Sequence, residues 1–171
     1  IAILCNLAFQ TKVNYNDIIV RPISNITDEI IDYTRKNNQC IKYVASAIKK
    51  GKNLTVVVEP TVFSKEHQFS SVMEEETILS FESEFNGKLT FQGLGAGGDS
   101  TGTAVVSDIV KIYEGINGYD YQNSNNYNIN QKYELSGNYL VKVKGEALKV
   151  MSSKELKNIV EDKKTQFYAK I

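Results

Sequence analysis

The sequence predicts an α+β fold, an antiparallel-dominated open sheet with helices packed on one face and a small C-terminal β-α-β appendage. Three observations support this prediction. Two pairs of alternating apolar segments are joined by short turn sequences, which is typical of antiparallel hairpins. Amphipathic segments of helical period flank these pairs. A polar, asparagine-rich stretch then separates them from a last strand-helix-strand pattern.

The first helix is predicted over residues 1–10, where apolar residues recur at helical spacing. Residues 13–23 are expected to form a connector with two short apolar clusters. A second helix is predicted over 28–37, with Thr27 as its N-cap. Acidic residues in its first turn and basic residues in its last turn favour the two ends of its dipole.

The apolar period then changes from helical to alternating. Residues 40–50 and 53–63 are predicted to be two strands joined by a Lys-Gly-Lys-Asn turn. Residues 76–85 and 88–93 alternate as well, and the Asn86-Gly87 dipeptide between them is a strong hairpin signal. These four strands are expected to form one antiparallel sheet with helices on one side.

A long helix is predicted over residues 100–114. Residues 116–138 are polar, rich in asparagine and tyrosine, and without apolar period, so they are interpreted as a linker. Residues 139–171 show the order strand, helix, strand. The predicted division is therefore a region 1–115, a polar linker 116–138 and a β-α-β tail 139–171.

Composition excludes several classes of function. The 171 residues carry 20 basic and 20 acidic side chains, which gives no electrostatic argument for a nucleic acid or an anionic membrane. The apolar runs are too short to span a membrane. Cys5 and Cys40 lie in apolar runs and are expected to be reduced, buried thiols of a cytoplasmic protein. The chain begins with isoleucine inside a helix, which predicts a piece of a longer polypeptide.

The spacing Gly93-x-Gly95-x-x-Gly98 is that of a Rossmann dinucleotide fingerprint. Such a fingerprint needs a strand-helix-strand unit, and here the helix runs into the polar linker, so no Rossmann domain is predicted to start at these glycines. Glycine still allows positive φ and close approach of a ligand. A tight turn without ligand and a ligand contact at the start of the helix both remain open.

Longer motifs around these glycines resemble homoserine dehydrogenases. Residues 93–110, GLGAGGDSTGTAVVSDIV, are similar to that family's G-x-G-A-G motif and the helix after it. Three more stretches match family motifs in the same order: LAFQTKV (7–13), ISNITDEI (23–30) and VEPTVFSKEHQFSSV (58–72).

The resemblance implies that 1–115 is the C-terminal portion of the family's catalytic and dimerisation region. The implied enzyme interconverts L-homoserine and L-aspartate 4-semialdehyde with NAD or NADP, on the route to threonine, methionine and isoleucine. It also implies a homodimer that pairs through the sheet. The third glycine of G-x-G-A-G, Gly97 here, is expected to contact the cofactor, with Gly95 as its neighbour. The choice between NAD and NADP stays open.

The family's catalytic lysine would lie immediately upstream of Ile1, and its Rossmann domain further upstream. Hydride transfer from a carbinol also needs a proton to leave the oxygen, which such a lysine can carry. No lysine near these motifs matches that position, neither Lys12, Lys42, Lys49, Lys50 nor Lys52. No catalytic residue is therefore predicted within the chain, and the fragment alone is predicted to be inactive.

Some residues depart from the family pattern. Gln10 replaces a glycine, and Glu74 and Thr77 stand where many members have a glycine and an asparagine, which leaves the local turn geometry open. Gly102 stands where alanine is commoner.

The tail lacks the P-G-V-L segment that begins many ACT regulatory domains. A diverged ACT-like unit and a simple extension packed on the sheet or a neighbouring subunit both remain open for it.

An alternative function is a non-catalytic, ACT-like regulatory or dimerisation module that binds a small amino acid.

No metal site is predicted: His67 is the only histidine and is expected to have a structural role, and the run 74–76 is interpreted as a solvated strand entrance. Four linker tyrosines are expected to cover apolar surface or stack on a partner: Tyr119, Tyr121, Tyr127 and Tyr133. Without interleaved basic residues, no nucleic-acid partner is predicted.

Overall fold

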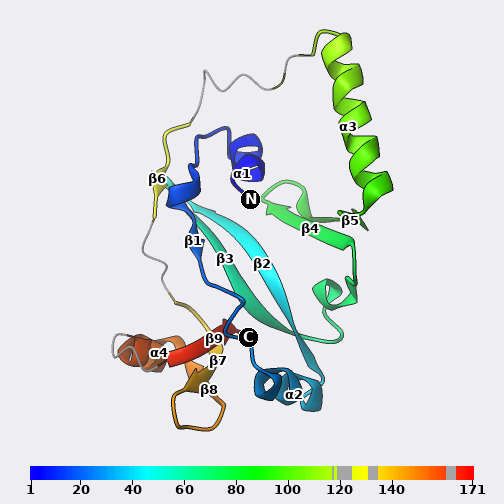
Figure 1. Ribbon diagram of the computed structural model, residues 1–171. Coiled ribbons are helices and arrows are strands. Elements are labelled where there is room, and N and C mark those ends of the chain that lie inside the picture. The colour runs from blue at the N-terminus through cyan, green and yellow to red at the C-terminus, as the bar shows by residue number, and fades with distance from the viewer. Residues whose placement is uncertain (117, 119–124, 131–134, 161–164) are drawn as a thin grey trace. The chain divides into compact units, whose positions relative to one another are not determined.

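The computed structural model of the chain describes residues 1–116, 118, 125–130, 135–160 and 165–171. These residues form two compact units (Figure 1). Unit 1 combines Ile1–Lys65 with Asp120–Ile171, and unit 2 spans Glu66–Tyr119. Along the chain, unit 2 is therefore inserted between two segments of unit 1.

The elements lie close to their predicted positions. The helices of unit 1 are α1 (Ala2–Phe9), α2 (Asp28–Lys36) and α4 (Ser153–Val160), with a 3-10 turn η1 (Tyr15–Asp17). Its strands are β1 (Ile19–Val20), β2 (Gln39–Lys50), β3 (Asn53–Ser64), β6 (Asn128–Ile129), β7 (Asn138–Val143), β8 (Lys149–Ser152) and β9 (Thr165–Lys170). Unit 2 contains η2 (Gln68–Ser71), β4 (Glu76–Ser83), β5 (Gly87–Leu94) and α3 (Gly98–Tyr113).

Strand β3 organises the main sheet. Strand β2 pairs with it antiparallel from end to end, and the two form a long twisted hairpin (Figure 1). The opposite edge of β3 is shared by three separate segments that all run parallel to it: β6 beside Asn53 and Leu54, β1 beside Val57 and Val58, and β9 at Thr61. Both edges of β3 are therefore occupied.

Antiparallel pairs dominate, because β7 also pairs antiparallel with β8 and with β9. The predicted α+β class with an open sheet is confirmed. The four central strands, however, do not form one sheet: β4 and β5 form a two-stranded sheet of their own. Because other strands pair with both edges of β3, β4 cannot pair with β3, the strand that precedes it in the chain.

The tail contains one more strand than predicted. Strand β8 covers residues 149–152 and thus lies just before the predicted helix, whose pattern starts at Ser152. Its Met151 is 8% exposed and packs in one cluster with Leu156 of α4. Four residues are too few to show an alternating period, so tertiary contact rather than local pattern defines this strand.

Every buried apolar side chain in the described residues belongs to unit 1. One cluster joins Ile30 of α2 to strands β3, β7 and β9. A second joins Cys5 of α1 to Leu54 and Val56 of β3. The third packs Leu156 of α4 on β7 and β8. The C-terminal residues therefore share one core with the N-terminal ones.

A buried ion pair ties the C-terminal strand to the centre of the sheet. Arg21 pairs with Glu59, and their side chains are 15% and 7% exposed. The guanidinium carbon of Arg21 lies 4.7 Å from the centroid of the Tyr168 ring, a cation–π contact. The backbone of Arg21 is fixed as well, since its amide donates to the Val58 carbonyl at 2.8 Å and its carbonyl accepts from the Tyr43 hydroxyl at 3.1 Å. This cluster couples β9 to β3.

The end of α1 shows how one departure from the family pattern is accommodated. Gln10 has φ 49° and ψ 56°, the left-handed conformation that glycine adopts most readily. Its amide donates to the Asn6 carbonyl and closes the helix. Glutamine adopts this conformation at a cost of about 1 kcal/mol relative to glycine.

The two other helices of unit 1 are capped differently. Thr27 is the N-cap of α2, as predicted, but its side chain makes no capping hydrogen bond. At α4, the Ser152 amide and hydroxyl donate to Oε2 of Glu155 at 2.8 and 2.7 Å, in the manner of a capping box. These bonds, the hydroxyl's first, lower the pKa of Glu155 below its ordinary value. Residues 161–163 of the predicted helix lie outside the described residues.

Much of the predicted linker 116–138 also lies outside the described residues. Its described part contributes β6 and Tyr127, whose ring meets that of Phe9 edge-on at 6.4 Å and covers the cluster around α1. The other three tyrosines, Tyr119, Tyr121 and Tyr133, are not among the described residues. The three-part division at 115 and 138 stays a prediction.

Both cysteines are free thiols. Cys5 is buried, and desolvation raises the pKa of its thiol. Cys40 is partly exposed, contrary to the expectation that both are buried. Among the helices of the described residues, none is both long and apolar enough to cross a membrane.

Unit 2 is built differently. The Asn86-Gly87 turn forms the predicted hairpin, with φ 63° at Gly87. Four apolar side chains lie on one face of this hairpin, since they form cross-strand pairs: Leu79 with Phe91 and Phe81 with Leu89. They remain 40–59% exposed. Within its described part, 66–116 and 118, unit 2 has no buried residue.

Candidate functional site

The glycine turn joins β5 to α3 within unit 2. Strand β5 ends at Leu94, and α3 begins at Gly98 with Gly97 as its N-cap. Gly97 has φ 95° and ψ 158°, a conformation that L side chains rarely adopt. The turn therefore needs glycine at this position for conformational reasons.

The carbonyl of Glu75 holds the turn in place. It accepts hydrogen bonds from the amides of Gly95 at 2.8 Å and Ala96 at 3.2 Å. Glu75 itself sits in a tight turn before β4, where the Glu76 amide donates to the Met73 carbonyl at 2.9 Å. Glu74 in this turn has φ 49°, a left-handed conformation that glycine adopts most readily.

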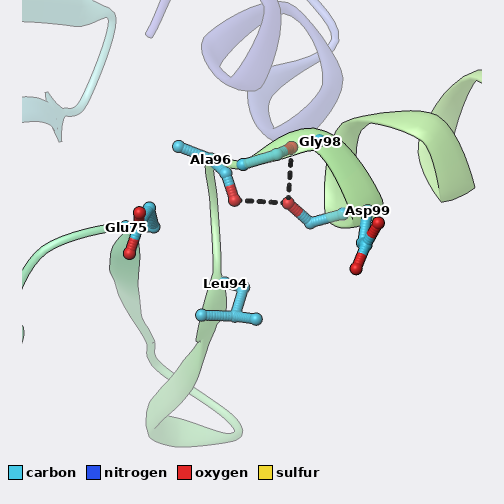
Figure 2. A pocket seen from close by; sticks show the side chains of 7 residues that line it. Glu75, Leu94, Ala96, Gly98 and Asp99 are labelled. Carbon is cyan, nitrogen blue, oxygen red and sulfur yellow. Dashed lines mark hydrogen bonds between the residues drawn. The ribbon is translucent and has the colours of Figure 1, made fainter.

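The start of α3 presents unpaired donors. Ser100 donates its hydroxyl to the Ala96 and Gly97 carbonyls, which fastens the turn to the first helical turn (Figure 2). The Thr101 amide bonds the Gly97 carbonyl at 3.1 Å and begins the regular helix. The amides of Gly98 and Asp99 precede it and have no acceptor within the helix. Together with the helix dipole they favour an acceptor group above the turn.

An open pocket lies over this turn (Figure 2). Its lining consists of Glu75, Leu94, Ala96, Gly97, Gly98, Asp99 and Ser100. The pocket combines backbone donors, one apolar wall from Leu94 and two carboxylates, from Glu75 and Asp99. The pocket can therefore hold and orient a group. No lysine or histidine is among these lining residues.

The two predicted site residues lie in the same turn but differ in their surroundings. Gly97 lines the pocket, whereas Gly95 does not. A Cβ added at Gly95 would lie 2.6 Å from Cβ of Thr77 and closer still to its Oγ1. Sequence reasoning missed Thr77 and Glu75 as neighbours of the turn. The Asn86-Gly87 hairpin signal carries this information, since its register pairs Thr77 with Gly93.

The other conspicuous residues have structural surroundings. Nδ1 of His67 accepts a hydrogen bond from the Phe69 amide at 3.2 Å, and the two rings meet edge-on at 5.3 Å. His67 thus caps η2, in line with the expected structural role. Within the described residues, no group of three or more histidine, cysteine, aspartate or glutamate side chains is arranged to hold a metal ion.

The family model of homoserine dehydrogenase matches residues 1–110. A homoserine dehydrogenase of Bacillus subtilis is 36% identical over 111 residues, which cover 65% of this chain and 26% of that protein. An NAD(+)-dependent homoserine dehydrogenase of Pseudomonas canavaninivorans is 30% identical over 115 residues, covering 67% of this chain and 33% of its own length.

Solved structures of homoserine dehydrogenases also match this chain. A homoserine dehydrogenase from Thiobacillus denitrificans matches 94% of this chain with a TM-score of 0.72, at 16% identity, which is a likeness of fold alone. The Staphylococcus aureus homoserine dehydrogenase at pH 7.0 matches 94% with a TM-score of 0.62 and 26% identity. The chain spans 47% and 39% of these two proteins. It thus spans less than half the length of all four relatives.

Proposed function

Since the chain belongs to the homoserine dehydrogenase family, we propose that it is the C-terminal portion of an enzyme that interconverts L-homoserine and L-aspartate 4-semialdehyde with NAD or NADP. This reaction would serve the synthesis of threonine, methionine and isoleucine in the cytoplasm. The observation that carries the proposal is Gly97, which adopts a glycine-specific conformation, lines an open pocket and starts a helix whose first amides lack partners.

The turn suits a nicotinamide dinucleotide. Gly97 has no side chain to hold a ligand away, and the first amides of α3 are donors for a carbonyl or amide oxygen. The carboxylates of Glu75 and Asp99 at the same pocket oppose a phosphate. We therefore assign the pocket to the nicotinamide end of the cofactor rather than to its pyrophosphate. When bound, the nicotinamide supplies the chemistry of accepting or returning a hydride.

The proton that accompanies the hydride needs a different group. No lysine is among the residues that line the pocket, and the family's catalytic lysine is expected at a position before Ile1. In this proposal the chain orients the cofactor through Gly97, while the upstream segment supplies the lysine and the Rossmann domain. The chain alone is therefore inactive.

We include a homodimer in the proposal. In the described residues β2 forms a strand pair only with β3, so no other described strand lies along its second edge. Tyr43 and Ile48 of β2 are 45% and 44% exposed. A long open edge with apolar side chains favours pairing with a second chain.

The test is homoserine-dependent reduction of NAD and of NADP, comparing this chain with a polypeptide that also carries its upstream coding region. We expect activity only in the longer form, which light scattering should show to be a dimer. Gly97→Val in the longer form should raise the cofactor KM by about tenfold or more while homoserine KM stays unchanged. Activity of the short chain, or an unchanged cofactor KM in Gly97→Val, would refute these roles.

A further inference from the structure

We propose that Thr77 is a positioning residue for the glycine turn: its side chain is the support against which Gly95 rests, and this contact fixes where Gly97 lies. The inference rests on the proposed function, because its readout is the cofactor contact of Gly97. It explains a glycine of the motif that does not itself line the pocket.

The requirement for glycine at position 95 has a steric cause. The φ of Gly95 is outside the left-handed region, so its backbone conformation would accept an L side chain. The obstacle is Thr77, because a Cβ at position 95 would lie 2.6 Å from Cβ of Thr77 and 3.5 Å from its Cγ2. Gly97 is different, since its φ of 95° demands glycine while the nearest atom to an added Cβ is Ser100 Oγ at 3.8 Å. The two glycines are therefore required for independent reasons.

Thr77 acts together with its neighbour Glu75. The Glu75 carbonyl binds the amides of Gly95 and Ala96, which fixes the backbone of the turn by hydrogen bonds. The Thr77 side chain closes off the space beside Gly95. Position 77 pairs with Gly93 in the β4–β5 ladder, so the hairpin register places both contacts at once. Gly95 lies two residues before Gly97. A change at the contact between Thr77 and Gly95 should therefore move the backbone of Gly97 as well.

The experiment uses the longer, active polypeptide and measures KM for the cofactor and for homoserine separately. Gly95→Ala forces a shift of the turn, and we expect the cofactor KM to rise about tenfold or more while the homoserine KM stays constant. The double variant Thr77→Gly with Gly95→Ala removes the clash and should return the cofactor KM to within about twofold of that of Thr77→Gly alone.

Two further variants sharpen the test. Thr77→Ala with Gly95→Ala should not restore the KM, because alanine keeps the Cβ that lies 2.6 Å from the added one. Gly93→Ala is the matched control, since it lies only two residues before Gly95, near the end of β5, and a Cβ there meets nothing within 4 Å. It should leave the cofactor KM unchanged. Circular dichroism of each variant checks that the fold is kept.

The outcomes separate this inference from the proposed function. An unchanged cofactor KM in Gly97→Val overturns the cofactor contact itself. With Gly97→Val effective, the inference is overturned if Gly95→Ala has no effect, or if its effect persists in an active Thr77→Gly background. If the Thr77→Gly background does not fold, the contrast between Gly95→Ala and Gly93→Ala decides, and equal effects of the two overturn the inference.

Discussion

The two units differ in whether buried apolar side chains stabilise them. Unit 1 contains every buried apolar side chain of the described residues, and three clusters join its helices to its sheet. The described residues of unit 2 include no buried one, although its hairpin and α3 carry many large apolar side chains. The candidate site lies in the unit without a core.

The turn of the candidate site is thus defined although none of its residues is buried. A two-stranded hairpin is only marginally stable by itself in water. The glycine turn is nevertheless specified by local means: two hydrogen bonds to the Glu75 carbonyl, the contact with Thr77 and the bonds of Ser100.

The largest effect is expected from a core leucine of unit 1. Leu140→Ala removes a fully buried side chain and should lower the free energy of unfolding by about 2–5 kcal/mol. Leu89→Ala in unit 2, where the side chain is 40% exposed, should cost about 1 kcal/mol or less. Urea denaturation followed by circular dichroism measures both. Equal losses would contradict the division into a unit with a core and one without.

A smaller effect is expected from the ion pairs of unit 1. Glu59→Ala removes the carboxylate that pairs with the largely buried Arg21 and should cost about 3 kcal/mol. The matched control is Glu29→Ala: Glu29 pairs with Lys142 at 2.7 Å but is 53% exposed, so the loss should be below about 1 kcal/mol. The same denaturation experiment compares them. A loss in Glu59→Ala no greater than in the control would show that Arg21 finds other compensation.

The smallest effect concerns the two residues with glycine-like backbone. Gln10→Gly removes the strain of a left-handed glutamine and should stabilise unit 1 by roughly 0.5 kcal/mol, after the entropic cost of glycine is subtracted. Glu74→Gly makes the same change in unit 2 and should leave the main unfolding transition in place, because that transition reports the core of unit 1. Differential scanning calorimetry distinguishes the two. Destabilisation by Gln10→Gly would mean that its side chain contributes more than its strain costs.

Sequence reasoning succeeded where a pattern is local. The helical and alternating periods placed α2, β2 and β3 within a residue or two, and Asn86-Gly87 placed the hairpin. It failed where pairing is tertiary. Strands β1 and β6 have two residues each and form because they pair with the edge of β3. Two residues are too few to show an alternating apolar pattern, so the sequence does not predict these strands.

In the candidate site, too, some features can be predicted from the sequence and others cannot. The glycines of the turn are visible in the sequence because their conformational role depends on residue type. The Glu75 contact is made by a backbone carbonyl, which every residue has, so its identity carries no signal. The contact of Thr77 with Gly95 appears only after the register of two strands is known.

The shared edge of β3 has a consequence for how the chain folds. Strands β2 and β3 are neighbours in sequence and can pair early, whereas β6 and β9 reach the other edge only after the chain has run through all of unit 2. Such non-local parallel pairing is slow compared with closing a hairpin. The entropy of closing that loop rises only slowly with its length, by about 0.6 kcal/mol for each doubling. A change in the length of the chain between β3 and β6 should therefore alter the free energy of forming the main sheet only slightly.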